Sequence, residues 1–218
     1  MAYMASTTHP QRFHTLEPNS SLAQHPEIAA LVKLQDAGLA TAEMVLMPPA
    51  SEEQFYQLNN LPHQLLMLFR GVDLADPDED DIEECAPKAQ ALLRSHYLLD
   101  EQIEAFYELL KRLPAKLVVR RASLAASGTS SKFLSPIVRG RPALLAVKDL
   151  WTDEWSFDAL MTRLQQTQTL APTASPVVVV GAGQQAGEDA LNAKASQILD
   201  QAVSVDVLEG AICSVSAR

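Results

Sequence analysis

The chain has 218 residues, 47% of them hydrophobic and 20% charged, a composition typical of a globular protein with one large domain or two small ones. Its net charge of −10 disfavours nucleic acid and anionic membrane surfaces as partners, because both require phosphate-neutralising cations. No apolar run approaches the ~20 residues that span a bilayer, and the polar N-terminus lacks an apolar signal core. We therefore expect a cytoplasmic protein. Cys85 and Cys213 have no metal-site spacing and are expected to be buried, reduced thiols.

The first half of the chain is predicted to be mainly helical. Residues 1–20 are polar and carry no apolar period, so we expect a flexible tail before a single domain that covers 21–218. A short apolar run at 44–47, ended by two prolines, predicts one strand. Apolar residues at helical spacing predict helices over 26–37, 52–59, 62–69, 77–86, 87–97 and 101–113.

The densest charge of the chain lies at 73–84. The spacing of the acids from Asp76 onward mimics the start of a calcium loop, but Asp81 stands where such a loop needs Gly, and Pro87 where it needs Glu. We therefore predict a solvated, acidic helix start that is capped by Asp76 and binds no calcium. Pro87 is expected to end that helix or to open the next one.

The second half alternates short apolar runs with helical patterns. Strands are predicted at 116–120, 136–138, 177–180, 203–208 and 211–215, helices at 143–151, 157–166 and 188–202, and a Pro/Thr/Gln linker at 167–175. Together with 44–47, the strands are expected to form one small mixed β-sheet behind a helical first half. The predicted fold class is therefore α+β or α/β.

One stretch, 116–133 (KLVVRRASLAASGTSSKF), joins a buried strand to a loop of small polar residues. Arg120 and Arg121 end the strand, and because side chains alternate along a strand, the two cannot face the same side. A fixed cation followed by backbone N–H groups is one way in which proteins hold phosphate oxygens. A structural salt bridge is the alternative for either arginine, with the acidic 76–84 region as one candidate partner. The candidate phosphate-binding or ligand-binding residues are Arg120, Arg121, Ser123, Ser130 and Lys132.

This stretch resembles part of the N-terminal ATP-binding domain of the pyruvate phosphate dikinase and phosphoenolpyruvate synthase family. In that family a strand carries Val-Arg-Ser-Ser, and Ser-Phe-Ala-Gly follows a small loop; 119–123 and 132–135 are similar to these motifs. The resemblance runs over 25–218 and implies one lobe of an ATP-grasp-like domain. Further counterparts follow in the family's order at 31–39, 44–49, 177–180 and 210–215, with a helix around Trp151.

Several positions depart from the family pattern. His25-Pro26-Glu27 stands near the place of its Gly-Gly-Lys, Gly181 replaces a Gln, and 124–127 replaces an acidic residue. The metal-binding acids of the family's second lobe have no visible match, and ATP chemistry needs carboxylates that hold Mg²⁺.

We therefore expect a pseudoenzyme: a non-catalytic binding or regulatory module that acts with a protein partner or as a homo-oligomer. No cofactor is assigned, and ATP is the candidate that the resemblance suggests. The alternative is an enzyme subunit that binds ATP or another phosphorylated ligand and is completed by a partner chain.

A second alternative is dinucleotide binding through the loop after the strand at 177–180. This segment fits strand–GxGxxA–helix, with Gly181 and Gly183 near the pyrophosphate and Glu209 on a ribose hydroxyl. The separation of Gly183 from Glu209 exceeds the usual ~20 residues, and the nine residues after Glu209 are too few to complete a doubly wound sheet.

Overall fold

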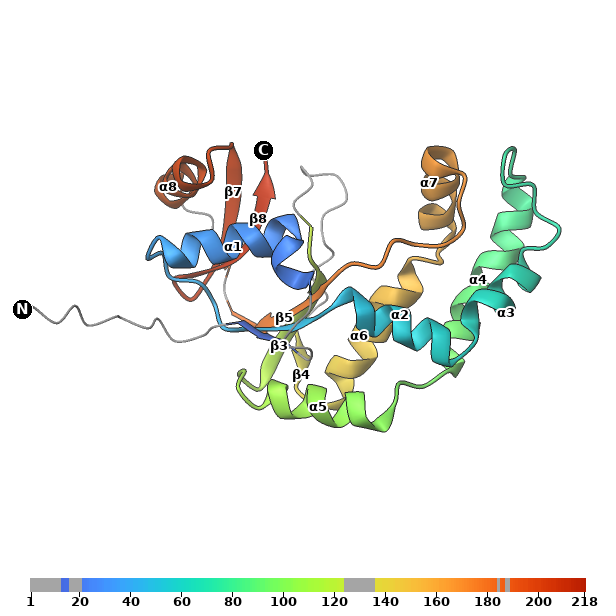
Figure 1. Ribbon diagram of the computed structural model, residues 1–218, viewed down its shortest axis with the longest axis horizontal. Helices are drawn as coiled ribbons and strands as arrows, with labels where there is room; N and C mark the ends of the chain where they lie inside the picture. Colours follow the sequence, from blue (N-terminus) through green and yellow to red (C-terminus); the bar gives the residue numbers. More distant parts are fainter. Residues whose placement is uncertain (1–12, 16–20, 124–135, 184, 187–188) are drawn as a thin grey trace, which may run out of the picture.

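A five-stranded sheet runs through the middle of the computed structural model, which describes residues 13–15, 21–123, 136–183, 185–186 and 189–218 (Figure 1). β1 pairs with β2 in parallel and the other neighbours pair antiparallel, so the sheet is mixed. β2 and β5 are apolar runs and β3 has an apolar centre between charged ends, the pattern of strands buried on both faces. The strand order is β1 (Phe13–Thr15), β2 (Met44–Met47), β5 (Val177–Gly181), β3 (Lys116–Arg121) and β4 (Ile137–Val138).

A second, smaller sheet corrects the prediction that all strands share one sheet. β6 (Gln185–Ala186), β7 (Val203–Leu208) and β8 (Ala211–Ala217) pair antiparallel with one another. The reason is local: Glu209 and Gly210 both have positive φ, 48° and 80°, which is the geometry of a tight hairpin turn. The turn folds β8 back onto β7, and the hairpin then packs against the large sheet as a unit.

The two faces of the large sheet bury two separate sets of apolar side chains. On β3, Leu117 and Val119 belong to one cluster, which we call the helical core. Val118, together with Ala122 just after the strand, belongs to the other, the hairpin core. Alternation along a strand explains this division, because successive side chains point to opposite faces. The sheet is thus the middle layer of the molecule.

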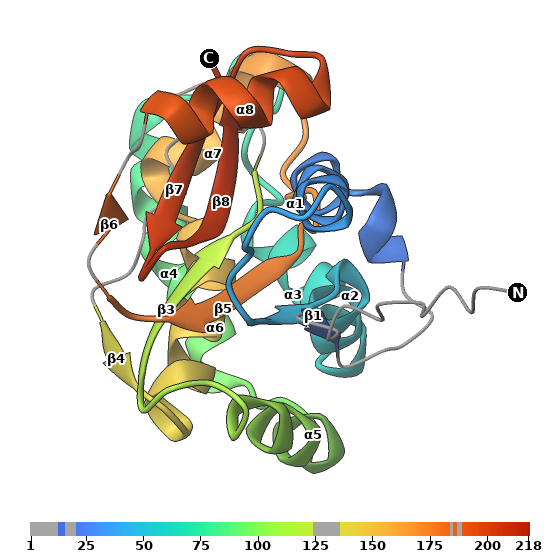
Figure 2. The ribbon, with the colours of Figure 1, turned by 90° about the vertical axis from the view of Figure 1, so that its left-hand side faces the viewer.

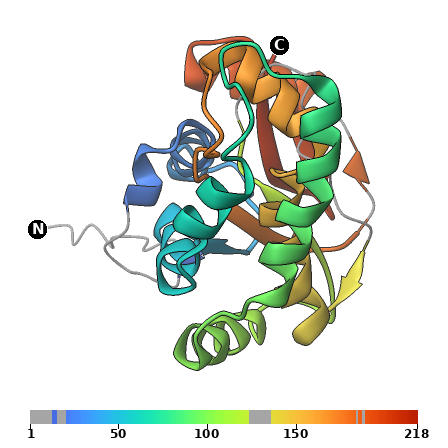
Figure 3. The same cartoon turned by 90° about the vertical axis from the view of Figure 1, so that its right-hand side faces the viewer.

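Helices cover both faces of the sheet unequally. The hairpin face carries α1 (Pro26–Asp36), α8 (Asp189–Leu199) and the short 3₁₀ helix η1 (Ser21–Gln24) beside β7 and β8 (Figure 2). The other face carries all the remaining helices of the described residues, which enclose the helical core (Figure 3). These are α2 (Pro49–Leu58), α3 (Leu61–Leu68), α4 (Glu79–Ser95), α5 (Asp100–Leu110), α6 (Arg141–Asp153) and α7 (Phe157–Thr167).

The predicted α+β class with a helical first half is confirmed, and two helix boundaries are corrected. Helix α2 begins at Pro49, with Ser51 buried in its first turn. Helix α4 is capped by Asp78, not Asp76, and it continues through Pro87. A proline inside a helix costs ~3 kcal/mol, but α4 buries an unbroken stripe that spans Pro87, and this packing outweighs the cost.

The acidic start of α4 is exposed, as predicted: the side chain of Asp78 accepts a hydrogen bond from the backbone N–H of Asp80 at 2.9 Å. Cys85 is half-buried and Cys213 is buried, and neither forms a disulfide. Within the described residues, no helix is long and apolar enough to cross a membrane.

Candidate functional site

Arg120 lies in the hairpin core and forms an ion pair with Glu27 of α1. Its two terminal nitrogens donate to the two carboxylate oxygens at 2.9 and 2.6 Å, and both side chains are fully buried. One of these nitrogens also donates to the carbonyl of Cys213 on β8, at 2.8 Å. The planar guanidinium suits this two-point contact with a carboxylate better than any other cation would.

Glu27 connects three parts of the fold. Besides Arg120, its carboxylate accepts the backbone N–H of Ser123 at 2.7 Å and that of Val215 at 3.3 Å. Helix α1, the end of β3 and strand β8 therefore meet at one carboxylate. Desolvating a charge is costly unless it is paired and hydrogen-bonded, and these donors meet that requirement.

Arg121 faces the opposite side of the sheet and forms a second cluster at the edge of the helical core. Its terminal nitrogens donate to both carboxylate oxygens of Glu52 at 2.9 Å, and one of them also to the hydroxyl of Ser175. The Nε atom lies 3.2 Å from the carboxylate of Glu154. One cation thus faces two carboxylates, of which Glu52 is 3% exposed and Glu154 33%.

Burial shifts the pKa values of two groups in this second cluster. Desolvation raises the pKa of Glu52 above the usual range for a glutamic acid, while the hydrogen bonds from Arg121 act in the opposite direction. Desolvation likewise raises the pKa of Tyr56, and the nearby charge of Glu52 adds to the effect. The guanidinium of Arg121 keeps its proton at any ordinary pH.

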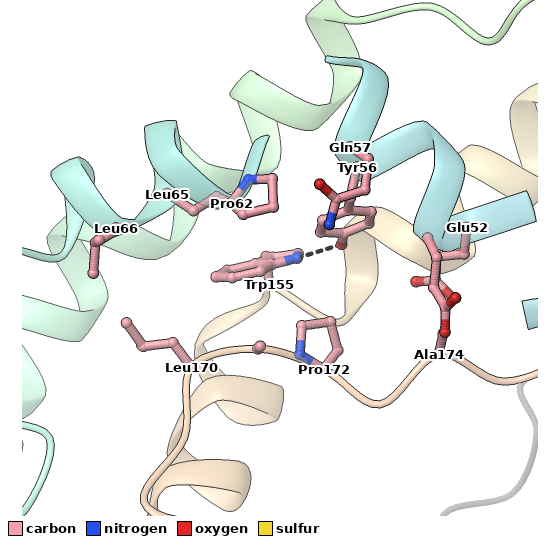
Figure 4. Close-up of a pocket in the computed structure, with 12 residues that line it drawn as sticks. Glu52, Tyr56, Gln57, Pro62, Leu65, Leu66, Trp155, Leu170, Pro172 and Ala174 are labelled. Carbon is pink, nitrogen blue, oxygen red and sulfur yellow. Dashed lines mark hydrogen bonds between the residues drawn. The ribbon is translucent and has the colours of Figure 1, made fainter. Parts of the chain in front are cut away.

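An apolar groove of about 320 Å³ opens beside the second cluster. Figure 4 shows the ring of Trp155 in the middle of the groove, with Pro62 on one side and Leu170 and Pro172 on the other. The indole Nε1–H of Trp155 donates to the hydroxyl of Tyr56 at 2.7 Å, which holds both rings in place. The groove is built by α2, α3, Trp155 and the 170–174 segment.

The two ends of the groove differ in polarity. Leu66 and Leu170 lie at one end, and Glu52 and Ala174 at the other (Figure 4). Glu53, next to Glu52 on α2, also lines the groove, and its carboxylate has no ion pair within the part of the chain that the structure describes. No basic side chain is among the lining residues.

The predicted phosphate-binding residues are divided between the two sides of the sheet. The prediction that Arg120 and Arg121 face opposite sides is confirmed. Their carboxylate partners are Glu27, Glu52 and Glu154, and not the acidic 76–84 region. Ser123 lies beside Glu27, while Ser130 and Lys132 fall outside the described residues.

The glycine-rich segment lacks the strand arrangement of a dinucleotide site. β5 pairs antiparallel with both of its neighbours, and β7, the next long strand, belongs to the other sheet, so these strands form no parallel βαβ unit. A Cβ atom at Gly181 would lie 2.9 Å from Cγ of Pro114, so glycine is needed there for packing. Glu209 occupies the β7–β8 turn, close to Gly183.

Sequence reasoning missed the main features of both clusters. The available signal for Glu27 and Glu52 is that each is an acid in the first turn of its helix, and that position does not identify an arginine partner. The groove has no sequence signal, because its lining comes from segments that are far apart in the chain. Among the described residues, no group of three His, Cys, Asp or Glu side chains is placed to hold a metal ion.

Comparison with models of known protein families finds no match for this chain, and comparison with curated proteins finds none either. The resemblance to the dikinase and synthase family therefore stays a prediction made from the residues.

Proposed function

We propose that this chain is a non-catalytic binding module that resembles one lobe of a dikinase-type ATP-binding domain. In this proposal Arg120, which stands at the place of the family's phosphate-binding residue, stabilises the fold and does not bind a ligand. The observation that carries the proposal is the ion pair between Arg120 and Glu27, in which both side chains are fully buried.

The geometry around Arg120 supports a structural role. A phosphate ligand needs the guanidinium at a surface, whereas this guanidinium already donates to Glu27 and to the carbonyl of Cys213. To bind an anion, Arg120 would have to leave Glu27 as an uncompensated charge in the hairpin core, a loss that typically costs ~3–5 kcal/mol. Arg121 is similarly engaged by Glu52 and Glu154.

The groove supports the binding part of the proposal. It is concave and mainly apolar, carries a few polar groups at one end, and lies at the lower limit of the ~300–1,000 Å³ typical of ligand pockets. Neither Arg120 nor Arg121 lines it. Binding at this groove would therefore be independent of phosphate chemistry.

Thermal unfolding with Mg-ATP, phosphoenolpyruvate, NAD or inorganic phosphate tests the proposal. A ligand present at about 100 times its dissociation constant stabilises a protein by ~2.7 kcal/mol, or ~5–10 °C in Tm at this chain length. We expect no shift beyond that of sodium chloride at equal ionic strength, and no ATP turnover.

A shift of several degrees with Mg-ATP or phosphoenolpyruvate would contradict the proposal and favour the enzyme subunit that a partner chain completes. A shift with NAD alone would instead favour the glycine-rich loop as a dinucleotide site.

A further inference from the structure

We propose that the groove beside Tyr56 and Trp155 binds a small amphiphilic cation, with a compact apolar body and one ammonium group. This inference deepens the proposed function, because it names the ligand class of a module that binds without catalysing a reaction. It rests on the groove's shape, its lining and its charge.

The shape and lining favour an apolar body. Trp155 is 2% exposed and still lines the groove, so its ring forms a floor and not a projecting side chain. Leu66, which is 64% exposed, extends the apolar surface outward from α3. Aromatic and apolar walls that enclose a volume of about 320 Å³ suit a compact ligand that is largely removed from water.

The charges favour a cationic group at the Glu52 end. Arg121 and Arg163 balance the charges of the carboxylates Glu52 and Glu154, with which both arginines interact electrostatically. Glu53 adds a carboxylate at the groove itself. The guanidinium of Arg163 lies 5.7 Å from the centre of the Trp155 ring.

The position of Arg163 also decides how the ligand is oriented. A second cation over the indole ring would be repelled by the first, so the apolar body and not the ammonium group should lie against Trp155. The ammonium group then lies toward Glu52 and Glu53, at the end opposite Leu66. An anionic ligand of the same shape would bring a second negative charge beside the carboxylate of Glu53 at that end.

Three probes with one common body test the proposal: phenylbutylammonium, phenylbutanol and phenylbutanoate. We expect titration calorimetry to give the tightest binding for the ammonium, with the alcohol about 5-fold weaker and the carboxylate weaker again. Because the chain has two tryptophans, the indole N–H signals offer a direct readout by NMR. The Trp155 signal should shift on binding and the Trp151 signal should not.

Matched variants separate the contribution of the charge to binding from that of the apolar surface. Glu53→Gln should remove most of the preference for ammonium over alcohol and leave alcohol binding unchanged, whereas Glu104→Gln, an exposed acid on α5 outside the groove, should have no effect. Leu66→Gln should weaken all three probes, while Leu58→Gln, 57% exposed and outside the groove, should not. All four side chains lie at or near the surface, so folding should be retained.

Equal or tighter binding of phenylbutanoate, or a Trp155 signal that stays unchanged at saturation, would overturn the proposal. So would self-association of the unliganded chain that Leu66→Gln abolishes, because a second copy would then cover the groove. These results would leave the proposed function intact, since only a response to ATP, phosphoenolpyruvate, phosphate or NAD contradicts that.

Discussion

Arg120 and Arg121 are neighbours in sequence and have opposite environments. Arg120 is fully buried among α1, β3 and β8, with its carboxylate partner equally buried. Arg121 is 13% exposed and lies near the groove, with one buried and one half-buried carboxylate. On one face of the sheet, Arg120 neutralises a buried carboxylate inside the hairpin core. On the other face, Arg121 pairs with two carboxylates at the edge of the helical core.

This difference arises because successive side chains of a strand point to opposite faces of the sheet, so each arginine has the environment of its own face. A charge in the hairpin core can be stable only if it is paired, and the Glu27 carboxylate accepts hydrogen bonds from Arg120, Ser123 and Val215. A charge at the edge of the helical core can be partly compensated by water and protons, so the Glu52 cluster can respond to pH and to nearby ligands. Substitutions on the two faces should therefore differ in size and in pH dependence.

The largest effect is expected for Glu27→Ala, which leaves the guanidinium of Arg120 buried without its carboxylate. We expect the free energy of unfolding, measured with urea, to fall by ~3–5 kcal/mol. Glu84→Ala is the control, because it removes an exposed pairing with Lys88 on α4 and should change nothing measurable.

The double variant Glu27→Leu/Arg120→Met sharpens this test. It should recover part of the loss, because the uncompensated charge disappears while the backbone N–H groups that bonded to Glu27 still lack their acceptor. If Glu27→Ala instead left stability unchanged, the cluster would not connect the hairpin to the sheet.

A smaller, pH-dependent effect is expected for Arg121→Ala. Burial already raises the pKa of Glu52, so folding favours its protonated form; this contribution is complete below the usual glutamate pKa and is lost as the pH rises through the raised one. Removing Arg121 should raise that pKa further. The variant should therefore lose ~1.5–3 kcal/mol at about pH 8 and distinctly less at about pH 5.

Arg112→Ala provides the matched control for this pH series. Arg112 is exposed and has no ion pair within the described ranges, so its removal should give an equal, small change at both pH values. A loss in Arg121→Ala that did not vary with pH would mean that Glu52 stays ionised in the variant, and the contrast between the two faces would fail.

Much of the fold could be predicted because the responsible signals are local. The strand at 44–47 was predicted with its observed bounds, since a continuous apolar run ends there at two prolines. The opposite orientation of Arg120 and Arg121 follows from the period of a strand alone. The continuation of α4 through Pro87 was missed, because it depends on how much surface the helix buries against its neighbours.

The clusters and the groove could not be predicted because they join distant segments. Arg120 and Glu27 are 93 residues apart, and Arg121 and Glu52 are 69 apart. Leu170 and Pro172 come from a stretch without helix or strand, and such a stretch has no period that indicates which side chains face a cavity. Only the packing of the sheet and the helices brings these residues together.

A moderate effect is expected for Gly181→Ala at the end of β5. The added methyl group would lie 2.9 Å from Cγ of Pro114, so the chain must shift, and we expect unfolding free energy to fall by ~1–2 kcal/mol in urea. Gly71→Ala is the control, since a methyl group there would meet nothing within 4 Å. Equal effects in the two variants would show that the contact with Pro114 does not require glycine.

The smallest effect concerns Glu209, whose φ of 48° is unfavourable for a glutamate and well tolerated by an asparagine. We expect Glu209→Asn to stabilise the β7–β8 turn by ~0.5 kcal/mol, or ~1–2 °C in Tm. Glu209→Gln is the matched control, because it removes the same charge without the conformational preference and should leave Tm unchanged. If both variants raised Tm equally, relief of charge repulsion in this acidic chain would explain the gain, and the backbone conformation would not. If both lowered it, the carboxylate of Glu209 itself would contribute to the fold, and its closeness to Gly183 would become the contact to investigate.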